Sequence, residues 1–516
     1  MQYGIAPPSD RLRFATARKL SHPKDGTGGA REKSRVWGSK VAAMAAPSTL
    51  PAPGSVLPVS VAAGNAVTAE VGAQILHQGG TAADAAVAMV LTSCVAETVF
   101  TGLGGGGFAT YFDASTKTTT CLDFFVAIPG LGGRRAMSTQ EISIDFGGQL
   151  VPYAVGPATV AVPGVAAGAA ALHERWGRLP WTDVVAPAIA HARLGVTLAP
   201  IHAKVLATVA PAMLIGEGLR AYAKDGEVLG GGGRVFHPGL DGALEVLAED
   251  GAEAFYTGQV AEAMVSAVGE RGDLSAADLA AYRVLESEPR RAALAGLEVL
   301  ARGDDLDDLL GTLDRLQVSS DPAEMASSMV EVLRAHPRRG DTTSVAVCDS
   351  AGNACAVTTS LGLASGVWLP EFGIHLNSML GESELLRHEL VPGSRMSSMI
   401  SPLIAMAPDG PAIVAGGAGG SRIRSALLQV LVNLVVHRLP VQAAVEAPRL
   451  NPVPDRVHVE PGFSPEVLAA LRSQDQVVEW PALDAYFGGV SVIDRTGPGA
   501  DPRRGGDTRT VSAGVS

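Results

Sequence analysis

The sequence predicts an α+β layered sandwich, and three observations support this fold class. Runs with strand character gather in the first 126 residues and again after residue 340. The stretch between them, residues 155–300, is mostly of helical character. No short repeat and no heptad run is present, and the strands do not alternate singly with helices. Two strand-rich blocks around a helical middle favour packed layers over a parallel βαβ series.

The composition is that of a large globular protein. The chain has 516 residues, of which 47% are hydrophobic and 18% are charged, so it can bury one large core or two to three smaller ones. Its net charge is −12 and its body has no long basic run, which argues against a nucleic-acid partner. The four cysteines have neither metal-binding nor secreted-type spacing, so we expect no metal site.

The first 50 residues form a basic, proline-rich tail that we expect to be disordered. Residues 1–40 carry nine lysines and arginines against three acidic residues. The segment has no apolar run long enough for a signal peptide or a membrane span, so we predict a cytoplasmic protein without a membrane partner. An alternative is that the tail is an extension upstream of a true start near Met44.

The first strand-rich block begins with one strand and two alanine-rich helices. We expect the strand at residues 59–63 and the helices at residues 65–78 and 81–95, with two glycines ending the first helix. Thr81 followed by Asp84 is a variant of the capping box and marks the start of the second helix. The small side chains on both helices predict close packing in the core.

The glycine run at residues 102–107 formally satisfies the dinucleotide-binding pattern. That pattern requires a strand before the glycines and a helix after them. Here residues 108–112 and 118–126 follow, and both have strand character. We therefore expect no nucleotide cofactor, and we interpret the glycines as a place where backbone passes close to another layer or to a substrate.

The middle of the chain is predicted to be helical, with a loop at the polar, glycine-rich residues 224–233. An acidic run at residues 304–308 leads into a further helical pattern. The helices that we expect before it lie at residues 164–176, 181–193, 240–250, 258–271 and 276–282.

A β-hairpin is predicted over residues 340–362, around a Ser-Ala-Gly-Asn turn. Its first strand opens with Thr342 and Thr343, and β-branched residues are ordinary at a strand start. With this turn, Cys348 and Cys355 would face each other across the two strands. We expect two reduced core thiols there, with a strained cross-strand disulfide as the alternative.

The second strand-rich block continues towards the C-terminus. Further strands are expected at residues 373–379, 403–406 and 412–415, with a loop at residues 397–402. A glycine-rich loop at residues 416–422 then leads into an apolar helix. Exposed N–H groups at such a helix N-terminus suit an anion or an oxyanion.

Four motifs in the second block resemble the gamma-glutamyltransferase family. They are GDTTSVAVCDSAGNA from residue 340, HLNSMLGE from residue 375, SSMISP from residue 397 and GGAGGSRI from residue 416. The resemblance implies a four-layer αββα sandwich of the N-terminal nucleophile hydrolase type. It also implies a precursor that cuts itself between Asp341 and Thr342. The products would be a large subunit, residues 51–341, and a small subunit, residues 342–516, which remain one folded unit.

The resemblance also assigns roles to individual residues. Thr342 would be the nucleophile, and its α-amine, freed by the cleavage and titrating near neutral pH, would be the general base. Gly419 and Gly420 would donate backbone N–H groups to the oxyanion, and Ser360 would bond the nucleophile. The small-molecule substrate would be held by Ser397, Ser398, Glu382 and Asn377, with the two serines on its carboxylate and the glutamate on its ammonium group.

One departure from the family concerns the substrate clamp. Where the family has an arginine that grips the γ-glutamyl α-carboxylate, this chain has Phe125, which cannot pair with a carboxylate. Residues 296–340 also lack the Pro-Ser-Ser-Gly-Gly segment of the family. The catalytic motifs predict cleavage of an amide bond through an acyl-enzyme, whereas Phe125 favours an acyl group that is less polar than γ-glutamyl.

Three functions remain open from the sequence. The first is a gamma-glutamyltransferase-like enzyme that hydrolyses or transfers γ-glutamyl or related acyl groups. The second is an acylase or an antibiotic-pathway hydrolase, including one that cleaves a carbon–carbon bond. The third is a non-catalytic homologue on the same scaffold.

Overall fold

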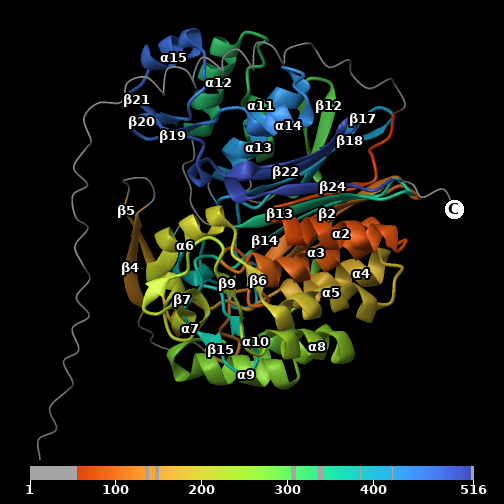
Figure 1. Ribbon diagram of the computed structural model, residues 1–516, viewed down its shortest axis with the longest axis vertical. Helices are drawn as coiled ribbons and strands as arrows, with labels where there is room; N and C mark the ends of the chain where they lie inside the picture. Colours follow the sequence, from red (N-terminus) through yellow and green to blue (C-terminus); the bar gives the residue numbers. More distant parts are fainter. Residues whose placement is uncertain are drawn as a thin grey trace, which may run out of the picture. The chain divides into compact units, whose positions relative to one another are not determined.

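Two antiparallel sheets lie face to face at the centre of the protein (Figure 1). The computed structural model describes residues 55–133, 139–145, 150–303, 309–334 and 342–512, except for residues 384, 387 and 421. The predicted tail, Asp341 and the acidic run at residues 304–308 lie outside this part of the chain.

The first sheet has seven strands in the order β10-β3-β2-β14-β13-β1-β24, so strands from both ends of the chain meet in it. The predicted hairpin is its centre, because β13 and β14 pair with each other and are flanked by β2 and β1. The strand bounds are β1 Ser60–Ala63, β2 Gly106–Asp113, β3 Thr118–Phe124, β10 Leu285–Ser287, β13 Thr343–Cys348, β14 Ala354–Ser360 and β24 Asp507–Thr510.

The second sheet has six strands in the order β11-β12-β17-β18-β22-β23, and it packs on the hairpin through β17, β18 and β22. Along β13, Ala346 and Cys348 belong to the apolar cluster between the sheets, whereas Val345 and Val347 belong to the cluster under the helices. The strand bounds are β11 Arg290–Leu294, β12 Leu297–Ala301, β17 Leu403–Ala407, β18 Gly410–Ala418, β22 Gly489–Asp494 and β23 Gly497–Ala500.

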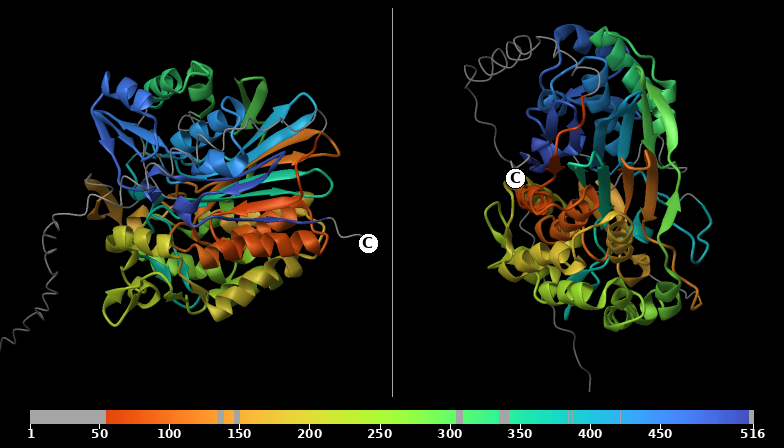
Figure 2. Two further views of the ribbon diagram at one scale, coloured as in Figure 1. Left: turned by 45° about the horizontal axis from the view of Figure 1, so that its top comes forward. Right: turned by 90° about the vertical axis from the view of Figure 1, so that its right-hand side faces the viewer.

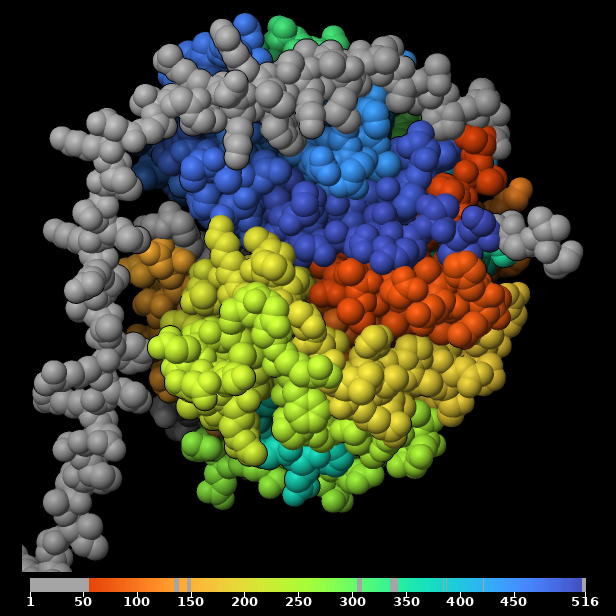
Figure 3. Space-filling model, viewed as in Figure 1, coloured from red at the N-terminus to blue at the C-terminus, as the bar shows by residue number. Residues whose placement is uncertain are grey.

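Helices cover the outer face of each sheet, which completes four layers (Figure 2). Helices α2, Ala66–His77, and α3, Ala82–Ala96, pack on the first sheet, and helices α13, Arg422–Val435, and α14, Val441–Glu446, pack on the second. The αββα sandwich predicted from the sequence motifs is therefore confirmed. On the face shown in Figure 3, the orange α2 lies directly beside the blue C-terminal strands, and Arg509 Nε donates to Glu70 Oε2 at 3.0 Å.

Helix α3 is the most deeply placed helix of the fold, because every one of its residues is buried. The predicted capping box is present: Asp84 N donates to Thr81 Oγ1 at 3.2 Å and Thr81 N donates to Asp84 Oδ2 at 2.8 Å. Alanine at six of its fifteen positions lets the helix backbone approach β13 and β14 closely.

The helical middle forms a block beyond α2 and α3, and its predicted helices are confirmed to within a few residues. The helix at Pro200–Met213 and the short strand pairs in the predicted loop were not foreseen individually. The helices are α4 Val165–Trp176, α5 Trp181–Leu194, α6 Pro200–Met213, α7 Gly218–Tyr222, α8 Leu240–Asp250, α9 Gln259–Val268 and α10 Ala276–Ala281. The short strands there are β6 Val196–Thr197, β7 Ala223–Lys224, β8 Glu227–Val228 and β9 Arg234–Val235.

The remaining elements lie at the periphery of the sandwich. Two helices follow the acidic run, as its helical pattern predicted. Within the described ranges, no helix has the length and apolar character that are needed to cross a bilayer. These elements are β4 Gln140–Asp145, β5 Leu150–Val155, α11 Leu309–Arg315, α12 Pro322–Arg334, β15 Trp368–Leu369, β16 Ile374–His375, β19 Leu450–Val453, β20 Arg456–Val459, α15 Pro465–Arg472 and β21 Val477–Glu479.

The structure corrects two details of the second block. Cys348 pairs with Ala354 and Cys355 pairs with Val347, so the two thiols lie on opposite faces of the sheet rather than facing each other. A register that differs by one residue moves a side chain to the other face. In addition, residues 416–418 end strand β18 rather than forming a loop, so the connection to α13 contains only residues 419–421.

All four cysteines are buried thiols outside any disulfide, and burial raises the pKa of Cys94 to about 12. We therefore predict that none of the four thiols reacts rapidly with a thiol reagent in the folded protein, because reaction requires an accessible thiolate. After unfolding in denaturant without reductant, all four should titrate. Fewer than four reactive thiols in the unfolded chain would contradict the free state of the Cys348 and Cys355 pair.

Candidate active site

Several strand ends meet at one end of the sandwich, and they bring Thr342 and Gly419 together. Strand β13 begins at Thr343, β14 ends at Ser360, and β18 ends at Ala418. Because Thr343 pairs with Thr359, the preceding Thr342 is a neighbour of Ser360 across the ladder. The antiparallel registers therefore place the start of the first motif and part of the fourth motif of the second block at the same edge.

Thr342 lies at this edge with its side chain 3% exposed. Gly419 N donates a hydrogen bond to Thr342 Oγ1 at 2.8 Å, which joins the end of β18 in one sheet to the start of β13 in the other. Gly419 has a φ of +116°, and a Cβ there would lie 2.8 Å from Gly488 Cα. A side chain would therefore be strained and crowded, so glycine is needed to present this N–H to the threonine oxygen.

Gly420 and Ser360 complete the immediate surroundings of Thr342. Gly420 has a φ of +59°, and its carbonyl accepts from Ile423 N at 2.9 Å in the first turn of α13. Ser360 is 4% exposed, and its Oγ accepts from Gly362 N at 3.0 Å. Their roles toward an oxyanion and toward the nucleophile stay predictions.

The structure places Asn377 and Glu382 in the buried surroundings of the glycine run and Ser360. Asn377 Nδ2 donates to Gly104 O and to Ala161 O, each at 2.8 Å, so this amide fixes the glycine run. Glu382 is 4% exposed, and a Cβ at Gly362 would lie 2.5 Å from Glu382 Oε1. Glu382 therefore packs against the turn that follows Ser360, whereas contact of either residue with a substrate stays a prediction.

The two predicted substrate serines lie on an extended loop before β17. Ser398 is buried, its Oγ accepts from Ile400 N at 3.3 Å, and its carbonyl accepts from Arg302 Nη2 at 2.5 Å. Ser397 is half-buried and lines a cavity of about 250 Å³ together with Arg302 and Arg395. The loop thus presents one serine to a cavity and holds the next by its backbone.

Phe125 is 1% exposed and belongs to the apolar core. Its ring is stacked on Phe108, with ring centroids 5.3 Å apart and an interplanar angle of 20°. Its carbonyl accepts from the Tyr282 hydroxyl at 2.7 Å. The position at which the family motif has an arginine is therefore filled by an aromatic pair with no charge to offer a carboxylate.

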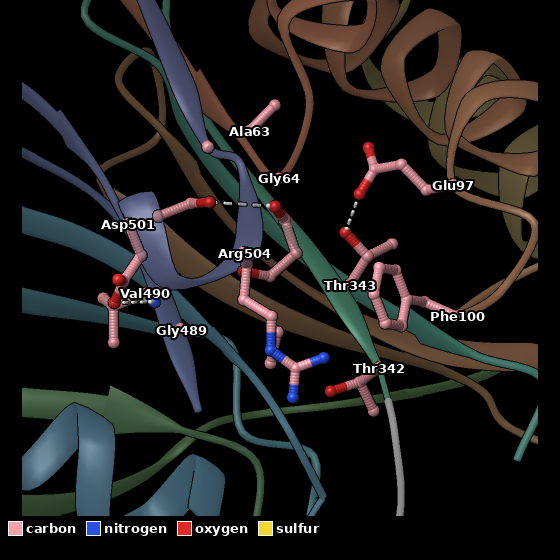
Figure 4. Close-up of a pocket in the computed structure, with 14 residues that line it drawn as sticks. Ala63, Gly64, Glu97, Phe100, Thr342, Thr343, Gly489, Val490, Asp501 and Arg504 are labelled. Carbon is pink, nitrogen blue, oxygen red and sulfur yellow. Dashed lines mark hydrogen bonds between the residues drawn. The ribbon is translucent and has the colours of Figure 1, made fainter. Parts of the chain in front are cut away.

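Glu97, at the end of α3, is a site residue that sequence reasoning missed. It lines the small cavity beneath Thr342, accepts from Thr343 Oγ1 at 2.5 Å and from Thr68 Oγ1 at 2.7 Å, and is 1% exposed (Figure 4). Burial raises the pKa of Glu97 to about 7. A glutamate directly after an alanine-rich helix was the available signal.

Arg504 is a second missed residue, and Figure 4 shows its guanidinium directed toward Thr342. It is 7% exposed, its Cζ lies 5.1 Å from the Phe100 ring centre, and its Nη2 donates to Ala485 O at 3.3 Å. A Cβ at Gly419 would lie 2.9 Å from the same Nη2. A positive charge beside both Thr342 and Gly419 suits an oxygen that becomes negative during a reaction.

A buried ion-pair network holds the segment that carries Arg504. Asp501 Oδ2 lies 2.5 Å from Arg449 Nη2, and Asp501 Oδ1 lies 3.2 Å from Arg503 Nη1. Glu460 Oε2 lies 2.5 Å from Arg503 Nη2. All four side chains are almost completely buried, so the network fixes the end of the chain against β22 and the candidate site. Among the described residues, no group of three or more His, Cys, Asp or Glu side chains converges as metal ligands would.

The αββα sandwich is that of the N-terminal nucleophile hydrolase type, and a solved structure has the same fold. The cephalosporin acylase from Bacillus halodurans superposes with a TM-score of 0.75 at 23% identity, covering 91% of this chain and 100% of that chain. The sequence profile of the family described as gamma-glutamyltranspeptidase matches residues 68–305 and 306–514. The chain therefore belongs to this family of enzymes.

Two curated relatives span most of the chain. The glutathione hydrolase proenzyme of Escherichia coli strain K12 is 28% identical over 87% of this chain and 90% of its own length. The acylase ACY 1 proenzyme of Pseudomonas sp. strain V22 is 27% identical over 82% of this chain and 87% of its own length. Both types of relative cover both sheets at nearly equal identity, so overall similarity does not separate γ-glutamyl substrates from other acyl groups.

The buried Glu97 should make stability depend on pH. In the unfolded chain this carboxyl ionises near pH 4.5, whereas in the folded protein its pKa is about 7, so its stabilising contribution is lost as pH rises between these values. The Glu97→Gln variant stays neutral, and its free energy of unfolding relative to the wild type should rise by up to roughly 3 kcal/mol from pH 5 to pH 8. Denaturant unfolding at both pH values measures this difference.

The exposed Glu70→Gln variant is the matched control, since Glu70 pairs with Arg509 at the surface and its replacement should show little change with pH. A difference between Glu97→Gln and the wild type that stays constant from pH 5 to pH 8 would contradict a raised pKa for Glu97.

Proposed function

We propose that this protein is an autoprocessing amide hydrolase or acyltransferase in which Thr342 is the nucleophile. The observation that carries the proposal is the 2.8 Å hydrogen bond from Gly419 N to Thr342 Oγ1 at the start of β13. A backbone donor already in contact with the attacking oxygen lies within reach of the oxygen that becomes negative in the tetrahedral intermediate. Loss of one such donor typically raises the barrier by roughly 3–4 kcal/mol.

The maturation step that we propose is an N-to-O acyl shift followed by hydrolysis. Thr342 Oγ attacks the carbonyl carbon of Asp341, the peptide C–N bond breaks, and the Asp341 carbonyl becomes an ester on Thr342. Water then hydrolyses the ester, which leaves a carboxylate on Asp341 and a free α-amine on Thr342. The products are the proposed large subunit, residues 51–341, and the proposed small subunit, residues 342–516.

In the mature protein the same threonine would supply both nucleophile and base. Its α-amine removes the proton from Oγ, which attacks the amide carbon of the substrate. Gly419 and Gly420 are the proposed oxyanion donors, and the Arg504 guanidinium adds a positive charge beside Gly419. The amine product leaves with a proton, and water or an acceptor amine resolves the ester on Thr342.

The acyl group that we propose is less polar than γ-glutamyl. A clamp for the γ-glutamyl α-carboxylate needs a guanidinium, whereas the buried Phe125 and Phe108 rings stack with centroids 5.3 Å apart in that place. Arg395, which lines the neighbouring cavity, already pairs with Asp123 at 3.1 Å. These contacts favour acylase-type substrates over glutathione.

Self-cleavage gives a direct prediction of the proposed function. The purified wild-type protein should appear as two fragments, and sequencing of the smaller should begin at Thr342. The Thr342→Ala variant should stay intact because it lacks the attacking oxygen, whereas Thr342→Ser keeps a hydroxyl and should be cut, more slowly. Intact mass measures all three. A wild-type chain that stays whole would contradict the proposal and favour a non-catalytic homologue. A Thr342→Ala chain cut at the same bond would contradict the role of Thr342 in the cleavage.

Acyl specificity gives a separate prediction. A missing charge-assisted carboxylate contact of 1.5–3 kcal/mol corresponds to roughly 10–100-fold in kcat/KM. The processed protein should therefore hydrolyse an anilide of an apolar acyl group, such as phenylacetyl p-nitroanilide, at least about tenfold more efficiently than γ-glutamyl p-nitroanilide. Release of nitroaniline measures both reactions. Efficient γ-glutamyl turnover with an ordinary KM would contradict the interpretation of Phe125.

A further inference from the structure

Arg302 stands where this chain departs most from its family. It directly follows β12, in the stretch that lacks the Pro-Ser-Ser-Gly-Gly segment, and it is 8% exposed. Its Cζ lies 3.8 Å from the centre of the Phe108 ring, on which Phe125 is also stacked. A guanidinium therefore lies one ring away from the position at which the clamp arginine was expected, but it comes from a different strand.

The donors of Arg302 are directed at the serine loop. Nε donates to Ile400 O at 2.8 Å and Nη2 donates to Ser398 O at 2.5 Å. The next alternate carbonyl, that of Pro402, accepts from Thr110 Oγ1 at 2.7 Å. In an extended chain alternate carbonyls point to the same side, so three of them are anchored to one surface. That surface is formed by Arg302 and by strand β2.

The position of Ser397 and Ser398 therefore depends on Arg302. A guanidinium can bond two carbonyls at once in a fixed geometry and stack on an aromatic ring, whereas neither lysine nor an apolar residue can do both. Thr110 and Phe108 stand two residues apart on β2 and support the loop from the same strand. An unanchored loop would move both serines relative to Thr342.

We propose that Arg302 is a substrate-positioning residue, which acts by holding the loop of residues 397–402 in place. The inference rests on the proposed function, because it assigns the loop serines to substrate binding. It predicts that Arg302 affects substrate binding far more than the chemistry at Thr342, since Gly419 and Thr342 are held by β18 and β13 without it.

The test compares Arg302→Met and Arg302→Lys with the wild type in the γ-glutamyl anilide assay, because that acyl group carries the carboxylate predicted for Ser397 and Ser398, with intact mass to confirm processing. Arg302→Met should raise KM about tenfold while kcat stays within about threefold, because the anchored carbonyls lose their partner. Arg302→Lys should give an intermediate KM, since the lysine ammonium can still donate a hydrogen bond but lacks the planar guanidinium that bonds two carbonyls at once. Arg291→Met is the control, because Arg291 is an exposed arginine on β11 that pairs only with Glu298 among the described contacts.

A merely structural role would lower the melting temperature of Arg302→Met and leave the KM of the folded fraction unchanged, and that result would overturn the inference. If Arg302→Met fails to fold, Thr110→Val decides, because it removes the bond to Pro402 O with little change in volume. It should raise KM in the same direction, and an unchanged KM overturns the inference. An active wild type with unaffected variants refutes this inference alone, whereas a wild type that neither cuts itself nor turns over an anilide refutes the proposed function as well.

Discussion

The hydrogen bond between Gly419 N and Thr342 Oγ1 is the contact on which the candidate site depends, because it joins the two sheets at the point where chemistry is proposed. The 2.8 Å length of this bond requires the last residue of β18 and the first residue of β13 to lie at the same edge. That edge is set by the pairing of each strand within its own sheet. The small residues of α3, the glycine run and the buried ion pairs near Arg504 all keep those ends in register. The site is thus a product of sheet packing rather than of one loop.

The fold was largely predictable because its signals are local. The hairpin, the capping box at Thr81 and the helix boundaries follow from turn residues and apolar periodicity, which act over a few neighbours. The register of Cys348 and Cys355 was wrong because the turn runs from Asp349 to Asn353, and a one-residue difference in a turn cannot be read from strand propensity.

Residues of the candidate site were predictable only where they lie in one of the sequence motifs. Thr342 and Gly419 stand together as the motifs implied, although they are 77 residues apart. Glu97 and Arg302 were missed because each is a single charged residue whose surroundings come from other strands and helices. Burial and hydrogen bonds make them notable, and neither property belongs to the sequence around them. Glu97 has its neighbours in Thr68 and Thr343, and Arg302 has its neighbours in Phe108 and Ser398.

The strand order of the first sheet has a consequence for a chain that cuts itself before Thr342. Strands β13, β14 and β24 would then belong to one fragment and β1, β2, β3 and β10 to the other, with β1 lying between β13 and β24. The two fragments would alternate in blocks across the sheet, so neither could leave without breaking ladders on both sides of β1. Cleavage would change the covalent connectivity of the protein and leave its strand pairing intact. The two fragments would remain one particle, and a fragment could be exchanged between particles only through unfolding.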